Sequence, residues 1–146
     1  MLKDCILGKI GVQFKKPKGI LGKFVSGLMK KGNQPKYDLM IKELNVSEGD
    51  SILEIGYGPG IGIEMITSLQ SKINVDGIDF SELMFKEASK RNKKKILDGK
   101  VRLYMGDFIN YSFNGNKYNK IFCINVIYFW DELITPFQKA NSLLKE

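Results

Sequence analysis

The 146-residue sequence contains no histidine, and this absence excludes several kinds of active site. A Ser-His-Asp triad, a zinc or iron site with histidine ligands and a kinase catalytic loop all need that side chain. Cysteine is nearly as scarce, with only Cys5 and Cys123 present. Two thiols cannot build a disulfide scaffold or a four-thiolate metal centre, so we expect no metal.

Long apolar runs and a signal-peptide core are also lacking. No apolar stretch has the length of a membrane span, and the first eleven residues are interrupted by Asp4. Cys123 lies within the apolar run 121–124, which is typical of a buried, reduced thiol. We therefore expect a cytoplasmic protein.

Charge divides the chain into two parts. Residues 1–36 contain nine lysines and one acid, whereas residues 37–146 contain fourteen basic and fifteen acidic residues. We predict a basic N-terminal helical arm over 1–36, with an amphipathic helix at 19–31, and a nearly neutral domain over 37–146. The arm leaves contact with nucleic acid or a membrane open as an alternative, but we favour a solvated basic face.

The domain alternates between two hydrophobic periods. Short apolar segments at 51–55, 73–78, 101–105 and 118–126 indicate strands. Helical spacing is found at 35–44, after the glycines that follow the first strand, from Ser81 into the lysine run 90–95, and from about Asp131 to the end. In the helix after the glycines, we expect Ile63, Ile66 and Leu69 to lie on one face. This alternation predicts an α/β fold, a doubly wound, Rossmann-like parallel sheet with helices on both faces.

A glycine-rich turn follows the first strand as Glu54-x-Gly56-x-Gly58-x-Gly60. Glycines allow a sharp turn and a close approach of the backbone to a ligand. The spacing is not that of a dinucleotide fingerprint, because isoleucine stands where the third glycine is required, and no P-loop lysine follows. A nicotinamide-dependent reductase is therefore a weaker alternative.

Acidic residues end the next two strands. Asp79 lies nineteen residues after Gly60, a distance that suits a carboxylate accepting hydrogen bonds from a ribose diol. The alternative is that Asp79 caps the helix that begins near Ser81. Asp107 ends the third strand and would, alone, be only a turn residue.

The four segments ILEIGYGPG, GIDFSELMFKEA, VRLYMGDF and KYNKIFCINVIYFW resemble motifs I to IV of the class I S-adenosylmethionine-dependent methyltransferases. The resemblance covers roughly residues 35–135. It implies S-adenosyl-L-methionine as cofactor and transfer of its methyl group to a small-molecule acceptor. The other alternative is a non-enzymatic basic module that binds nucleic acid or membrane through the arm.

The resemblance also implies site residues. The methionine end of the cofactor would be held by Glu54, Gly56, Gly58 and Gly60, with Asn125 near its amino acid group. Asp79 would hold the ribose, and the adenosine would contact Phe80, Met84, Asp107 and Phe108. No catalytic base is assigned. Tyr128 and Trp130 either contact the acceptor or pack above the sheet.

The sequence departs from this family after its fourth strand. The family's sheet has seven strands in the order 3-2-1-4-5-7-6, whereas this chain stops after one further helix. We therefore expect a chain truncated on the acceptor side, with an open edge along the fourth strand through which it could self-associate.

Overall fold

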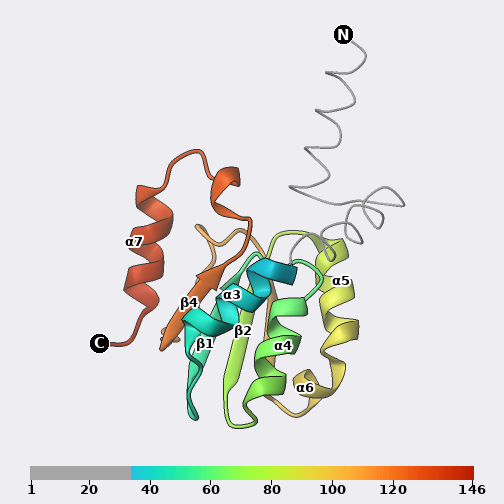
Figure 1. Cartoon of the computed structure of the whole chain (residues 1–146). Coiled ribbons are helices and arrows are strands. Elements are labelled where there is room, and N and C mark those ends of the chain that lie inside the picture. The colour runs from blue at the N-terminus through green and yellow to red at the C-terminus, as the bar shows by residue number, and fades with distance from the viewer. Residues whose placement is uncertain (1–33) are drawn as a thin grey trace.

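The computed structural model describes residues 34–146, which form a parallel four-stranded sheet between two layers of helices (Figure 1). The strands are β1 (Ser51–Ile55), β2 (Asn74–Asp79), β3 (Val101–Met105) and β4 (Lys120–Cys123). The helices are α3 (Gln34–Leu44), α4 (Ile61–Leu69), α5 (Glu82–Arg91), α6 (Lys93–Leu97), the 3-10 helix η1 (Ile127–Phe129) and α7 (Ile134–Leu143). The helix predicted at 19–31 lies outside the described residues, and the boundary predicted at 36/37 falls inside α3.

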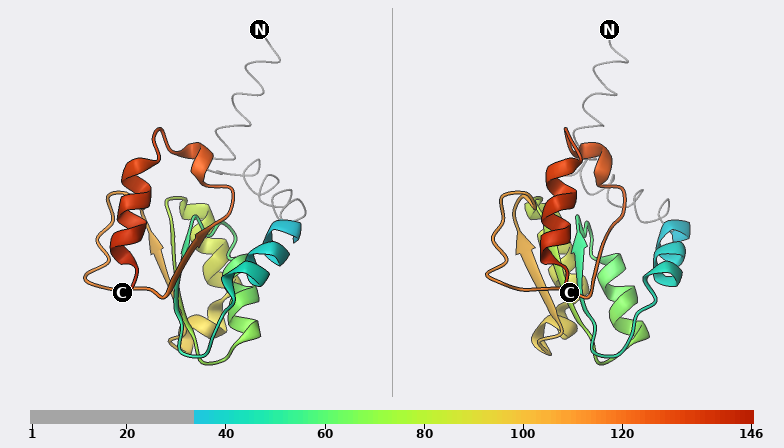
Figure 2. Two further views of the ribbon diagram at one scale, coloured as in Figure 1. Left: turned by 60° about the vertical axis from the view of Figure 1, so that its left-hand side comes forward. Right: turned by 90° about the vertical axis from the view of Figure 1, so that its left-hand side faces the viewer.

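The strand order is β3-β2-β1-β4, and every neighbouring pair is parallel. Glu54 at the centre of the sheet is in register with Gly77 of β2 and Phe122 of β4. Helices α3, α4 and α5 lie on one side of the sheet and α7 on the other (Figure 2). The predicted Rossmann-like doubly wound fold is confirmed.

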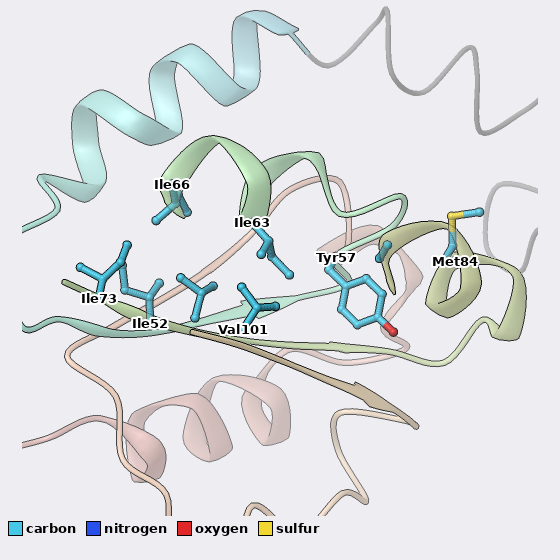
Figure 3. Packing of buried hydrophobic residues seen from close by; sticks show 9 residues of the cluster. Ile52, Tyr57, Ile63, Ile66, Ile73, Met84 and Val101 are labelled. Carbon is cyan, nitrogen blue, oxygen red and sulfur yellow. The ribbon is translucent and has the colours of Figure 1, made fainter. Parts of the chain in front are cut away.

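The first core layer lies between the sheet and α4 and α5 (Figure 3). Along β1 and β2, successive side chains point in turn into this layer and into the layer on the opposite face of the sheet. This is expected for strands that are covered on both sides. The layer consists of Ile52, Tyr57, Ile63, Ile66, Ile73, Val75, Met84, Ala88 and Val101. Leu69, which ends the same helix as Ile63 and Ile66, is 57% exposed, so this layer does not extend to the last residue of α4.

The second core layer lies beneath α7 and is rich in aromatic rings. Its buried members are Leu53, Ile55, Ile78, Phe108, Phe113 and Tyr118. A buried carboxylate, Asp76 of β2, is paired here: it accepts hydrogen bonds from Arg102 Nε of β3 at 2.9 Å and from Tyr118 Oη, just before β4, at 2.8 Å. The pairing compensates the cost of burying the charge.

Several element boundaries differ from the predictions: β2 is shifted by one residue, and β4 begins at Lys120 and not at residue 118. The fourth strand ends at Cys123 and not at residue 126, because Asn125 adopts a left-handed conformation with φ 58°. The helix from Ser81 stops at Arg91, where the buried Asn92 separates it from α6. The last helix begins at Ile134, later than expected. Of the helices that the structure describes, none is long and apolar enough to cross a membrane.

The outer edge of β4 is partly covered after α7. Leu144 forms a parallel bridge to Tyr118, with Tyr118 N–H donating to Leu143 O at 2.8 Å and Lys145 N–H donating to Tyr118 O at 2.9 Å. This bridge covers the edge two residues before β4 begins. Along Lys120–Cys123, the described residues provide a strand partner on the β1 side alone.

Candidate functional site

The glycine turn joins β1 to α4 at the carboxyl end of the sheet. Gly56, Gly58 and Gly60 all have positive φ values, between 52° and 76°, which other L-residues adopt only with strain. Gly60 is the N-cap of α4, and it has no side chain to satisfy the free N–H groups of the first turn. Gly56 N–H donates to Ile78 O at 2.7 Å and Gly60 N–H to Tyr57 O at 2.9 Å, so hydrogen bonds hold the turn at the carboxyl end of the sheet.

Asp79, at the end of β2, braces this turn. One carboxylate oxygen accepts a hydrogen bond from Gly58 N–H at 2.9 Å, and the other accepts one from Ser81 N–H at 2.8 Å. Ser81 in turn caps α5 by accepting from Met84 N–H. Burial holds the pKa of Asp79 above its usual value, and the two backbone hydrogen bonds offset part of this rise. Each oxygen has a second lone pair, so the structural role and a ribose-binding role are compatible.

A cavity of about 500 Å³ opens beside Asp79, at the carboxyl ends of the four strands. Ligands of open α/β sheets bind in this position. Eight of the ten predicted site residues line the cavity: Gly56, Gly58, Asp79, Phe80, Met84, Asp107, Phe108 and Asn125. Glu54 and Gly60 do not line it.

Glu54 lies beneath the start of α4 instead. Its side chain is 1% exposed and packs so closely on Gly62 that a Cβ there would be 2.7 Å from Glu54 Oε1. The carboxyl group accepts a hydrogen bond from Ile63 N–H, while Oε2 has no hydrogen-bond partner among the described residues. Burial, and next the charge of Asp79, hold the pKa of Glu54 well above its usual range. Glu54 is thus placed to support the turn from below.

Replacing Glu54 by glutamine should raise the free energy of unfolding more at pH 8 than at pH 4.5. A carboxyl with a raised pKa in the folded state stabilises the fold at low pH, and this contribution is lost as pH rises towards the folded-state pKa. Glutamine does not ionise, so the variant avoids that loss. Urea unfolding at both pH values measures the difference, with the exposed Glu48→Gln as control. If Glu54→Gln changes the free energy of unfolding by the same amount at both pH values, the raised pKa of Glu54 is contradicted.

Three aspartates provide the charge of the cavity. The described residues that line it include Asp79, Asp107 and Asp131 but neither lysine nor arginine. Asp107 is exposed, and its carboxylate accepts from Ile109 N–H at 3.2 Å and from the Asn110 side chain. The cavity therefore favours a cationic ligand over an anionic one.

Aromatic rings form the wall towards α7. Phe108 and Trp130 stack with their ring centroids 6.2 Å apart, and Trp130 lines the cavity. Tyr128 is exposed and lies outside this wall. Lys139 of α7 holds the loop that follows β3, because its Nζ donates to Ile109 O at 2.7 Å and to Tyr111 O at 2.6 Å.

Sequence reasoning missed several lining residues. Ile55, Ile78, Gly106, Ile109, Ile124, Val126, Phe129 and Asp131 also line the cavity. Most of them adjoin a predicted residue in the sequence. Their position at or just after the carboxyl ends of the predicted strands could therefore have identified them. Within residues 34–146, no group of three His, Cys, Asp or Glu side chains is placed to hold a metal ion.

Comparison with known proteins gives consistent matches. Residues 52–146 match a family described as methyltransferase domain. Over 118 residues the chain is 32% identical to the uncharacterized methyltransferase YdaC of Bacillus subtilis, which covers 81% of this chain and 63% of that protein. It is also 30% identical over 108 residues to 24-methylenesterol C-methyltransferase 2 of Arabidopsis thaliana, covering 74% of this chain and 30% of that protein.

A solved structure has the same fold. It is a SAM-dependent methyltransferase from Thiobacillus denitrificans in complex with S-adenosyl-L-homocysteine, with a TM-score of 0.65 at 20% sequence identity. The match covers 77% of this chain and 44% of that one. The chain thus spans less than two thirds of the length of each of these three proteins.

Proposed function

This chain belongs to the methyltransferase domain family, and from that premise we propose that it binds S-adenosylmethionine and takes part in methyl transfer to a small-molecule acceptor. The cofactor occupies the cavity between the glycine turn and the Phe108–Trp130 wall. Its volume of about 500 Å³ is within the usual range for a small-molecule site.

The observation that carries this proposal is the charge of the cavity. S-adenosylmethionine is a nucleoside with a cationic sulfonium and no phosphate, so an acidic cavity suits it. A nicotinamide dinucleotide has an anionic pyrophosphate, which nucleotide sites neutralise with helix N–H groups and often with cations. The three aspartates of this cavity would repel it.

Within the cavity, position suggests a role for each side chain. Asp79 accepts from the ribose hydroxyls with its remaining lone pairs, and Phe80 and Met84 flank the adenosine. Asp107 accepts from the adenine amino group beside the Phe108 ring. Gly56, Gly58 and Asn125 face the methionine end, while Glu54 and Gly60 shape the turn from outside the cavity.

The bound cofactor supplies an activated methyl group, which an acceptor takes by in-line displacement. The protein then has mainly to position the two reactants and to exclude water. Rigid backbone provides the positioning here, because Asp79 ties the glycine turn to α5 and Lys139 ties the 109–111 loop to α7. A chain without histidine can perform this chemistry.

Asp107→Ala should weaken binding of S-adenosylhomocysteine by about tenfold, the effect of one lost hydrogen bond to a charged group. Asp107 accepts from local loop groups at an exposed position, so the free energy of unfolding should change little. Calorimetric titration of the intact chain measures the affinity, with the exposed Asp98→Ala as control. Equal affinities of the two variants would remove Asp107 from the site.

We further propose that the β4 edge supports self-association. Exposed strand edges offer unpaired backbone groups to other chains. Within residues 34–146, the outer side of β4 has no strand partner, and the bridge of Leu144 to Tyr118 lies two residues before this strand. Static light scattering over a concentration series should show a mass rising above the 16.6 kDa of the monomer. A constant monomer mass at every concentration would contradict this proposal.

A further inference from the structure

A second hollow lies between α3 and β4, on the sheet face opposite α7, and we call it the α3–β4 groove. It has a volume of about 450 Å³ and is lined by Lys36, Leu39, Met40, Glu43, Leu44 and residues 122–125. The side chains of Leu39, Met40, Leu44, Phe122 and Ile124 make its walls mostly apolar. Figure 1 shows α3 running across the sheet beside β4.

The groove and the cavity beside Asp79 share a wall. Ile124 and Asn125 line both, so these two residues separate the cavity from the groove. Asn125 Oδ1 accepts hydrogen bonds from Lys36 Nζ of α3 and from Tyr128 Oη of η1. Two elements thus hold Asn125 at the junction, in a left-handed conformation that ends β4.

The polar groups of the groove lie at its ends. Lys36, in the first turn of α3, is at the junction with the cavity, and Glu43 is two helical turns away near the end of α3. A ligand that fits this pattern has a hydrocarbon body along Leu39 and Met40 and an anionic head near Lys36. We propose that the α3–β4 groove binds the methyl acceptor and that this acceptor is an apolar carboxylate.

This inference rests on the proposed function and explains how transfer could proceed without a dedicated base. A carboxylate is already deprotonated at neutral pH, so no proton has to be removed. A lone pair of the carboxylate oxygen forms the new O–CH₃ bond while the S–CH₃ bond breaks and its electron pair stays on sulfur. The anion and the sulfonium give a neutral methyl ester and neutral S-adenosylhomocysteine, so atoms and charge balance.

Two exposed leucines provide a matched test. Leu39 lies in the groove and is 58% exposed, whereas Leu69 of α4 lies outside it and is 57% exposed. Dodecanoate is titrated into the intact chain saturated with S-adenosylhomocysteine. We expect Leu39→Glu to weaken dodecanoate binding about tenfold or more, because it places a charge against the hydrocarbon chain, and Leu69→Glu to leave it unchanged.

Lys36→Gln tests the polar end of the groove. It should weaken binding of dodecanoate but not of dodecanol, which has the same chain without the charge. With S-adenosylmethionine in place of S-adenosylhomocysteine, gas chromatography should detect methyl dodecanoate from the wild type and less from Leu39→Glu.

The outcomes separate this inference from the proposed function. If S-adenosylhomocysteine fails to bind the wild type, the proposed function itself is wrong. If it binds all variants equally while Leu39→Glu and Leu69→Glu take up dodecanoate alike, or no dodecanoate binds, the groove is not the acceptor site. If Lys36→Gln weakens the binding of dodecanoate and of dodecanol equally, the proposal that the ligand has an anionic head is wrong.

Discussion

Asp79→Ala is expected to weaken binding of S-adenosylhomocysteine by roughly ten- to a hundredfold, the equivalent of about 1.5–3 kcal/mol for hydrogen bonds to a charged group. The carboxylate lines the cavity and is only 8% exposed, so water cannot readily replace it. Its removal also frees the glycine turn, because Gly58 N–H loses its acceptor.

The same variant should lower the free energy of unfolding by about 1–3 kcal/mol for each donor left unpaired, Gly58 N–H and Ser81 N–H. Calorimetry gives the affinity and urea unfolding gives the stability. Asp98→Ala, at an exposed position after α6, is the control for both. Unchanged affinity in Asp79→Ala would show that Asp79 only braces the turn and α5.

Gly60→Ala should be among the most destabilising single substitutions in the turn, with a loss of about 2–5 kcal/mol in the free energy of unfolding. A left-handed alanine costs roughly 1–2 kcal/mol, and overpacking adds about 1–3 kcal/mol. The added Cβ would lie 2.8 Å from Ala88 Cβ and 3.0 Å from Ala88 Cα, where α5 packs on the turn.

Gly58→Ala is the matched comparison. Its φ is also positive, but a Cβ there would meet no atom within 4 Å, so only the conformational cost of roughly 1–2 kcal/mol applies. Gly58 lines the cavity and Gly60 does not. In Gly58→Ala, the loss in binding free energy of S-adenosylhomocysteine should therefore exceed the loss in the free energy of unfolding. Urea unfolding and calorimetry compare the two variants. A Gly58→Ala as unstable as Gly60→Ala would contradict this division of roles.

Much of the fold follows from local patterns. The bounds of β1 and β3 agree with the predicted strands, because each is a short apolar segment between turn residues. Ser81 was predicted as a helix cap and is one, since its hydroxyl reaches the third residue of α5. Parallel strands bring their carboxyl ends together, so Asp79 and Asp107 could be placed at one edge without coordinates.

What the sequence could not show depends on contacts between distant segments. Glu54 precedes the glycines by two residues, yet the register of the sheet directs its side chain under α4 and away from the cavity. Lys139 reaches the loop at 109–111 from thirty residues away. The α3–β4 groove depends on how a helix lies against a strand some eighty residues later, and no periodicity encodes that placement.

The central claim is that the acidic cavity takes S-adenosylmethionine, and a thermal unfolding series with three ligands tests it most directly. S-adenosylhomocysteine, NADH and ATP are each added to the intact chain at the same concentrations. A ligand at about a hundred times its dissociation constant stabilises by roughly 2.7 kcal/mol, which raises the Tm of a chain of this size by on the order of 5–10 °C. We predict such a rise with S-adenosylhomocysteine and none with NADH or ATP, whereas a rise with NADH and none with S-adenosylhomocysteine would contradict the account.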